Sequence, residues 1–170
     1  MKELLDIARK SIEEYIKHKR TYNLHERDYP FKPQRAACFV SLKKEGRLRG
    51  CIGTLEPTEK DLIQETIRNA QAAATRDTRF PPVTLNELDL LNISVDILSE
   101  PVPALFPWIE DPKKFGIIVK KGFRRGVLLP DIETVDTPDE QFRISCMKAG
   151  LSYDEPGIEV MRFTVTRIKP

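Results

Sequence analysis

The chain has 170 residues, and its 28 Lys and Arg nearly balance its 26 Asp and Glu, for a net charge of +2. This balance argues against a dedicated nucleic-acid-binding protein, and 32% charged with 40% hydrophobic residues is wrong for a disordered chain. No apolar run approaches the ~18 residues of a membrane span, and the acids Glu3 and Asp6 near the start do not fit a secretory signal.

The first predicted elements are a helix and a hairpin. Apolar residues recur at helical spacing over residues 2–19, which predicts an amphipathic helix. Further on the period changes to two, and Gly46 ends a polar turn between two such runs. This pattern predicts an antiparallel hairpin of residues 36–42 and 47–55.

Helix starts are predicted from capping patterns. Three threonines are each followed three residues later by an acid: Thr58 with Asp61, Thr84 with Glu87, and Thr137 with Glu140. Such pairs indicate the first turn of a helix. The third helix is also bounded by Pro138 at its first position and by Gly150, which suits a left-handed cap at its end.

Strands are predicted in three parts of the second half of the chain. Residues 91–97 alternate between apolar and polar, as a half-buried strand does, whereas four prolines make residues 100–114 mostly loop. Residues 115–129 predict a second hairpin, and apolar residues alternate in a last strand over residues 161–165. Helices combined with hairpins predict an α+β fold with antiparallel sheet.

The cysteines and histidines are few. Cys38, Cys51 and Cys146 are too scattered for a disulfide framework or a zinc knuckle, and the chain has two histidines. We therefore expect a reducing, cytoplasmic setting and no metal site. Cys38 and Cys146 share their faces with apolar residues and are expected in the core.

The segment around Cys51 is the sharpest chemical feature. Gly50 and Gly53 flank Cys51 inside a predicted strand, and glycine in a strand indicates a bulge or the close approach of a backbone or ligand. On a two-residue period Arg49 shares the face of Cys51. A guanidinium near a thiol favours the thiolate, so one interpretation is a reactive cysteine beside an anion-binding arginine. The alternative is a small buried cysteine in a tight sheet.

The second chemical feature is the loop that contains Asp77 and Arg79. An aspartate just past a helix C-terminus is unfavourable for the helix dipole, so Asp77 needs a partner, Arg79 or Arg49. The pair is either a structural clamp or part of a polar cluster around Cys51 that binds a carboxylate or phosphate. We predict that residues 77–80 fold back onto the Cys51 strand beside a polar pocket.

A third feature is the basic segment Lys120–Gly126, which contains one aromatic residue, Phe123. The combination is compatible with nucleic-acid contact. A solvated hairpin tip that resists aggregation is the simpler interpretation.

These motifs together resemble a known family. Leu48-Arg49-Gly50-Cys51-Ile52-Gly53, the LRGCIG motif, resembles the signature of the AMMECR domain family. Similar matches run along the chain at residues 77–83, 94–98, 111–116, 125–130 and 148–150. Thr78 stands where proline is usual, and Thr134 stands where bacterial members often carry glycine.

The resemblance implies a single domain over residues 1–170, built of two intertwined subdomains with antiparallel sheets, in which the Cys51 segment faces a cleft. The prokaryotic members are similar to the A component of the AmmeMemoRadiSam system. That similarity implies a Memo-like protein and a radical S-adenosylmethionine enzyme as partners. It specifies neither a reaction nor a cofactor, so both are unknown at this point.

Three functional hypotheses remain from the sequence. The first is a component of a modification pathway in which Cys51 is the nucleophile or carrier, Arg49 and Arg79 hold a small anionic ligand, and Asp77 orients an arginine. In that hypothesis Gly50 and Gly53 let the ligand approach. The second is a non-catalytic adaptor that docks a partner enzyme, and the third is an RNA-contacting module.

Overall fold

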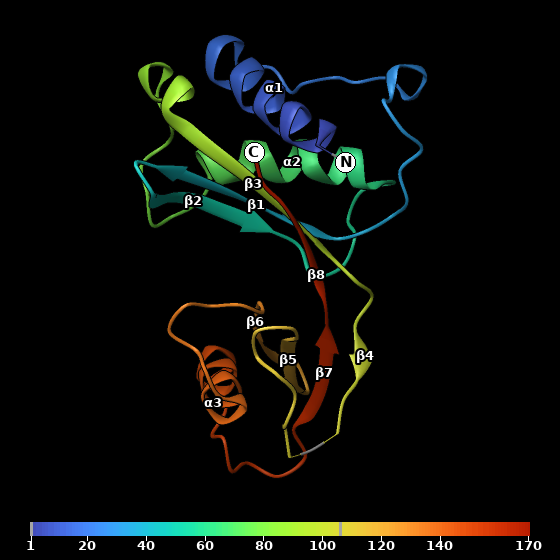
Figure 1. Cartoon of the computed structure of the whole chain (residues 1–170), viewed down its shortest axis with the longest axis vertical. Coiled ribbons are helices and arrows are strands. Elements are labelled where there is room, and N and C mark those ends of the chain that lie inside the picture. Colours follow the sequence, from blue (N-terminus) through green and yellow to red (C-terminus); the bar gives the residue numbers. More distant parts are fainter. Residues whose placement is uncertain (1, 106) are drawn as a thin grey trace. The chain divides into compact units, whose positions relative to one another are not determined.

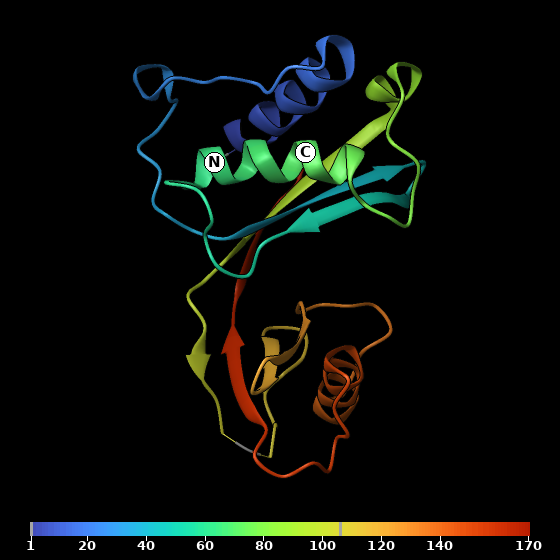
Figure 2. The ribbon, with the colours of Figure 1, turned by 180° about the vertical axis from the view of Figure 1, so that it is seen from behind.

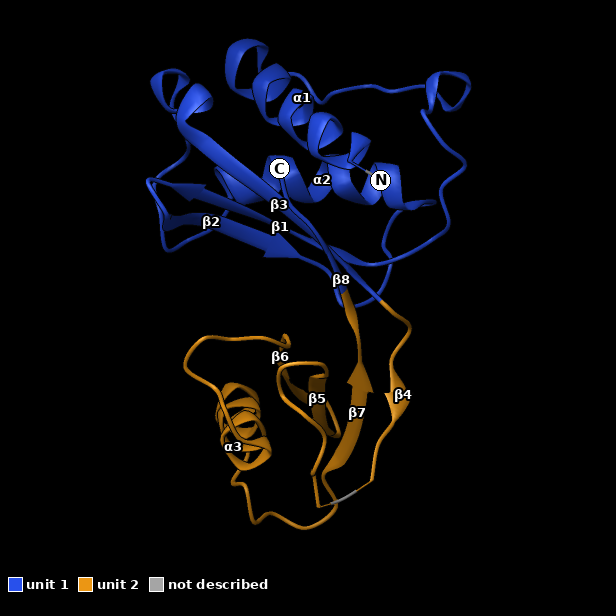
Figure 3. Cartoon of the chain, viewed as in Figure 1, with its two compact units in different colours: residues 1–98, 166–170 blue, residues 99–165 orange. Residues whose placement is uncertain are grey.

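The computed structural model describes residues 2–105 and 107–170, and it confirms the α+β class. The chain forms two compact units, one of residues 1–98 with 166–170 and one of residues 99–165 (Figure 3). Each unit contains one four-stranded sheet, and the pairings β1–β2, β1–β3, β4–β7, β5–β6 and β5–β7 are antiparallel. No helix in the described part of the chain is long and apolar enough to cross a membrane.

Unit 1 is a sheet in the order β2-β1-β3-β8 covered by helices. Its elements are α1 (Glu3–His18), the 3₁₀ helices η1 (Glu26–Asp28) and η2 (Leu85–Leu90), β1 (Cys38–Lys44), β2 (Arg47–Gly53), α2 (Leu62–Thr75), β3 (Leu91–Leu98) and β8 (Val165–Ile168). Figures 1 and 2 show α1 and α2 on the same side of this sheet. The core between them is a cluster of fully buried side chains that includes Leu4, Ile12, Ile63, Val40 and Val95.

The alternation of β1 gives the sheet of unit 1 two different faces. Val40 and Leu42 belong to the core under the helices, so Phe39 and Ser41 point to the opposite face. Two cross-strand neighbours lie on this same face. Asp96 of β3 pairs with Phe39, and Cys51 of β2 pairs with Ser41. We call this side of the sheet, opposite α1 and α2, the polar face.

The predicted hairpin of β1 and β2 is confirmed. Its two-residue turn has positive φ at Glu45 (52°) and Gly46 (76°), the conformation that matches the twist of paired strands. The register then skips one residue, because Leu42 pairs with Gly50 while Lys43 pairs with Leu48. Arg49 is therefore the extra residue of a β-bulge.

Two of the three predicted caps are confirmed, and one is wrong. Both Thr84–Glu87 and Thr137–Glu140 form reciprocal capping boxes. The cap of α2, however, is Asp61, which accepts a hydrogen bond from the Gln64 N–H at 2.9 Å. Thr58 was predicted at that position, but its N–H and hydroxyl donate instead to the buried carboxylate of Glu65.

Unit 2 has the sheet order β4-β7-β5-β6, with one helix packed against it. Its elements are β4 (Val102–Pro103), β5 (Gly116–Lys121), β6 (Arg124–Leu128), α3 (Pro138–Ala149) and β7 (Glu159–Phe163). The core includes Ile117, Val119, Phe142 and Cys146, the last only 1% exposed, as predicted. β4 lies within the segment predicted as mostly loop.

The predicted last strand is in fact two strands in different sheets. β7 pairs in unit 2 and β8 in the sheet of unit 1. Between them the Thr164 N–H donates to the Ser99 hydroxyl at 2.9 Å, and the Thr164 carbonyl accepts from the Ser99 N–H at 3.0 Å. Ser99 thus binds both backbone hydrogen-bonding groups of Thr164, between β7 and β8. The alternation of apolar residues in the sequence does not reveal this contact.

The packing of α2 on β2 gives a test at Gly50. A Cβ atom there would lie 2.3 Å from the Ala73 carbonyl oxygen, in the backbone of α2. Gly50→Ala should therefore lower the free energy of unfolding by about 3 kcal/mol, because neither backbone can give way cheaply. Urea unfolding measures this loss.

Gly122→Ala is the control for that test. Gly122 has a positive φ of 59° but nothing within 4 Å of the added Cβ, so its cost should be only about 1 kcal/mol of backbone strain. Equal losses for the two variants would show that α2 does not press on β2 at Gly50.

Candidate functional site

Cys51 lies in the middle of β2, an edge strand of the sheet in unit 1. Its side chain is half-buried on the polar face, where the Ser41 hydroxyl donates a hydrogen bond to the thiol sulfur at 3.2 Å. Burial raises the pKa of the Cys51 thiol, although the Ser41 hydrogen bond and the charge of Arg79 act in the opposite direction. The resting thiol is therefore protonated near neutral pH rather than activated.

The carboxylate of Asp77 lies at the outer edge of β2. Because Ser41 is the cross-strand neighbour of Cys51, the backbone N–H of Cys51 points away from β1 when the two form a non-hydrogen-bonded pair. Asp77 Oδ2 accepts this N–H at 2.8 Å, and the Asp77 side chain is only 5% exposed. The prediction that this loop folds back onto the Cys51 strand is confirmed.

Arg79 completes this edge contact as the partner of Asp77. Its Nε and Nη2 donate to the two Asp77 oxygens at 2.9 and 2.7 Å, and Nη2 also reaches the Cys51 carbonyl at 3.5 Å. Asp77 thus binds the N–H of Cys51, and Arg79 binds its C=O. On an edge strand these two groups would otherwise be open to pairing with a further strand. The hydrogen bonds from Arg79 hold the pKa of Asp77 well below its ordinary range, against the opposing effect of burial.

One edge of the Arg79 guanidinium is left uncommitted. Nη1 donates no hydrogen bond to any of the residues that the structure describes, and the Arg79 side chain is 57% exposed. The guanidinium plane is nevertheless fixed, because Nε and Nη2 are both bound to Asp77. The arrangement therefore presents a positioned cationic edge next to Cys51.

Arg49 is committed elsewhere. Its Nε and Nη2 bind the two Glu87 oxygens, each at 2.9 Å, and Nη1 donates to the Pro81 carbonyl at 2.9 Å. Arg49 thus pairs with the carboxylate of Glu87 and not with that of Asp77, for which the sequence offered it as one of two partners. The expectation that it shares the face of Cys51 and stabilises the thiolate is wrong, because the bulge removes Arg49 from the regular alternation.

Glu87 and Ser41 are the site residues that sequence reasoning missed. Glu87 was predicted as the capping acid of η2, and it does accept the Thr84 N–H and hydroxyl. The same carboxylate also binds Arg49 and Lys44, and the hydrogen bonds, with that from Arg49 strongest, hold the Glu87 pKa well below its ordinary range. Ser41 was identifiable only from the strand register.

The glycines of the segment have packing reasons. A Cβ at Gly50 would strike the Ala73 carbonyl, and one at Gly53 would lie 2.2 Å from the Phe39 ring. Their lack of side chains is thus required by α2 and by an aromatic ring. A role in ligand approach remains a prediction.

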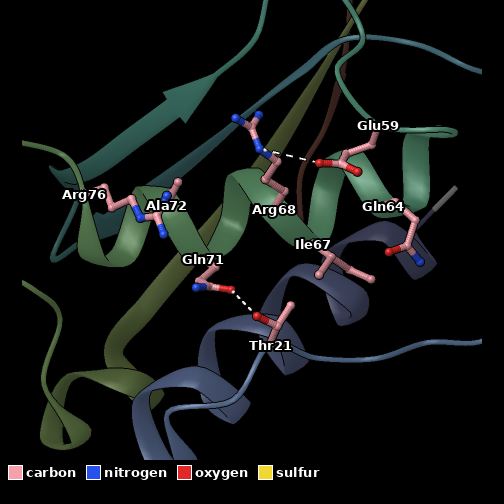
Figure 4. A pocket seen from close by; sticks show the side chains of 8 residues that line it. All are labelled: Thr21, Glu59, Gln64, Ile67, Arg68, Gln71, Ala72 and Arg76. Atoms are coloured by element: carbon pink, nitrogen blue, oxygen red, sulfur yellow. Dashed lines mark hydrogen bonds and ion pairs between the residues drawn. The ribbon is translucent and has the colours of Figure 1, made fainter.

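The hollow drawn in Figure 4 lies elsewhere in unit 1, along α2. It has a volume of about 300 Å³, and its lining includes Gln71, which accepts a hydrogen bond from Thr21, and Arg68, which pairs with Glu59. The predicted pocket beside Cys51 stays a prediction. Within the described residues no three His, Cys, Asp or Glu side chains gather as metal ligands.

Comparison with known proteins identifies the family. The AMMECR1 family model matches residues 5–168. The chain belongs to the AMMECR1 family. It is 55% identical over 137 residues to a Thermotoga maritima protein, covering 80% of this chain and 79% of that one.

Two further proteins are similar to this AMMECR1 chain, one in its structure and one in its sequence. The crystal structure of PH0010 from Pyrococcus horikoshii matches with a TM-score of 0.88 at 32% identity, covering 98% of this chain and 89% of that one. Protein CA_C1420 of Clostridium acetobutylicum is 47% identical over 132 residues, which cover 77% of this chain but 28% of that protein. The AMMECR1 segment is there part of a much longer polypeptide.

The buried carboxylate gives a pH-dependent prediction. Because the folded-state pKa of Asp77 is lowered, its stabilisation is complete above the unfolded-state pKa of about 3.9 and declines as the pH falls below it. Asp77→Asn should cost about 2 kcal/mol at pH 7, and urea unfolding should show a smaller loss at pH 3.

The control is Asp139→Asn, which breaks the exposed ion pair with Arg143 on α3. It should change stability by less than about 0.5 kcal/mol. If both variants lost the same stability at pH 7, the Asp77 contact would be no more than a surface ion pair.

The state of the Cys51 thiol gives a second prediction. The pH profile of Cys51 alkylation by iodoacetamide, followed by peptide mass spectrometry, should have a midpoint above the ordinary value of about 8.5, because burial raises the pKa. Arg79→Gln should raise that midpoint further, because the positive charge favours the thiolate. A midpoint below 8.5 would restore the nucleophile hypothesis for Cys51.

Proposed function

We propose that this AMMECR1-family protein is a ligand-binding component of a modification pathway and not the catalyst of that pathway. In this proposal Arg79 holds the anionic group of a small ligand beside Cys51. The observation that carries it is the geometry of Arg79, whose Nε and Nη2 are fixed by Asp77, while Nη1 donates to no described residue and the side chain is 57% exposed.

The chemistry of the exposed edge favours a carboxylate or phosphate. A guanidinium offers charge-assisted hydrogen bonds in a planar arrangement that matches the oxygens of these groups. Because Asp77 already fixes the guanidinium of Arg79, a ligand loses little free energy in ordering it. Arg49 does not serve this purpose, since Glu87 and two proline carbonyls bind its guanidinium.

Cys51 fits a contact role better than a nucleophilic one. Its thiol is half-buried, hydrogen-bonded by Ser41, and has a raised pKa. A ligand held by Arg79 would lie close to this sulfur without needing to react with it. The covalent chemistry then belongs to partner proteins.

The partners in this proposal are a Memo-like protein and a radical S-adenosylmethionine enzyme, as the resemblance of the motifs implies. The Clostridium relative supports association with further domains, because the matched segment makes up 28% of that protein. The same observation favours the second candidate function, an adaptor that docks an enzyme and binds no small ligand. Ligand binding at Arg79 separates the two.

The test is an NMR titration of the ¹⁵N-labelled chain with inorganic phosphate, pyrophosphate and citrate. The Arg79 Nε–H and Cys51 amide signals should shift together with at least one probe. Arg79→Gln should weaken that binding by about tenfold, and Arg79→Lys, which keeps the charge but loses the planar fork, should be intermediate.

Arg76→Gln is the matched control, because Arg76 is an exposed arginine three residues earlier in the chain. It should leave the binding of the probes unchanged within about twofold. Two results would contradict the ligand site and favour the adaptor. One is that none of the three probes shifts the Arg79 signal, and the other is that Arg76→Gln weakens probe binding as much as Arg79→Gln does.

A further inference from the structure

The tip of the β5–β6 hairpin in unit 2 carries an aromatic residue that buries almost nothing. Phe123 is 98% exposed and follows Gly122, which has a positive φ of 59° in the two-residue turn. A phenylalanine at such a position contributes no burial to the fold. We call Lys120–Arg125 the hairpin tip.

The hairpin tip places like charges opposite each other on its two strands. In the strand register Lys120 stands opposite Arg125, and Lys121 stands opposite Arg124. Like charges directly opposite each other destabilise an antiparallel pair. The inner pair is offset by Glu155, which binds Lys121 at 2.8 Å and Arg124 at 2.6 Å.

The outer pair lies on the other face of the hairpin. Lys120 has Glu159 as its neighbour on β7 in the register, yet it forms no ion pair with any residue that the structure describes. Lys120 and Arg125 are both exposed. The tip therefore carries cationic groups on either side of an exposed aromatic ring.

The strand after Phe123 is anchored to its surroundings. Besides Glu155, the Gly150 carbonyl accepts a hydrogen bond from Arg124 at 3.0 Å. At the base of β6, Gly126 has no side chain and packs directly against the backbone of Ser145 in α3. Little conformational entropy is lost when a tip fixed in this way binds a partner.

We propose that the hairpin tip is a docking anchor that inserts Phe123 into an apolar pocket, rimmed by carboxylates, on a protein partner. Exposed aromatic side chains are among the residues that dominate protein interfaces, and Lys120 supplies positive charge that an acidic rim complements. The proposal concerns unit 2 and does not depend on the ligand site at Arg79.

The composition of unit 2 favours a protein over a nucleic acid as the partner. Residues 99–165 contain more acidic than basic side chains. A nucleic-acid strand that continued past the tip would meet this excess of negative charge. A pocket on a protein partner, by contrast, can receive the Phe123 ring and the neighbouring cations without contacting unit 2 beyond the tip.

The first step of the test is photo-crosslinking in the organism that makes the protein, with p-benzoyl-phenylalanine in place of Phe123. The same group in place of Met147, which is 71% exposed on α3, is the matched control. We expect a protein adduct from position 123 and not from 147, with the crosslink mapped to apolar residues flanked by Asp or Glu. No adduct at 123, an adduct to nucleic acid, or the same adduct from both positions overturns the proposal.

The second step measures the affinity of the purified chain for the partner found in this way. Phe123→Ala should weaken binding by about 30-fold or more and leave urea unfolding unchanged, whereas Phe123→Tyr should bind nearly as well as the unaltered chain. Lys120→Glu should mainly slow association and reduce its salt dependence. Unchanged affinity for Phe123→Ala overturns the proposal, even where a partner has been captured.

Discussion

One buried carboxylate organises the candidate site. Asp77 accepts the outward N–H of Cys51 at 2.8 Å and binds the guanidinium of Arg79 through both oxygens. Since β2 is an edge strand, this N–H would otherwise be open to pairing with another chain. The Asp77–Arg79 pair therefore closes the edge and fixes the loop after α2 along it.

The remaining contacts extend this arrangement along the same loop. Arg49 binds the Pro81 and Pro82 carbonyls and Glu87, so the loop is tied to β2 at a second point. Gly50 has no side chain, so the backbone of α2 packs closely on β2 at this position. Most of the LRGCIG motif thus holds β2, α2 and the loop after α2 together, and Arg79, which binds Asp77 in this arrangement, has a side chain that is 57% exposed.

The local signals predicted most of the fold, and long-range contacts explain the failures. The capping box of Thr137 is complete within four residues, so it was predicted correctly. Thr58 has the same local pattern, but the buried Glu65 seven residues later takes its hydrogen bonds. In the site, the sequence offered Arg79 or Arg49 as the partner of Asp77, and the structure shows the near neighbour Arg79, whereas the Arg49–Glu87 pair depends on a bulge that the sequence does not show.

Amide hydrogen exchange at Cys51 tests the central claim most directly. If Asp77 takes the place of a neighbouring strand, the Cys51 N–H is protected in the unaltered chain although it lies on a sheet edge. It should exchange about 100-fold faster in Asp77→Ala, while the amide of the fully buried Val95 in β3 keeps its rate. A Cys51 amide that exchanges equally fast in both proteins would contradict the account.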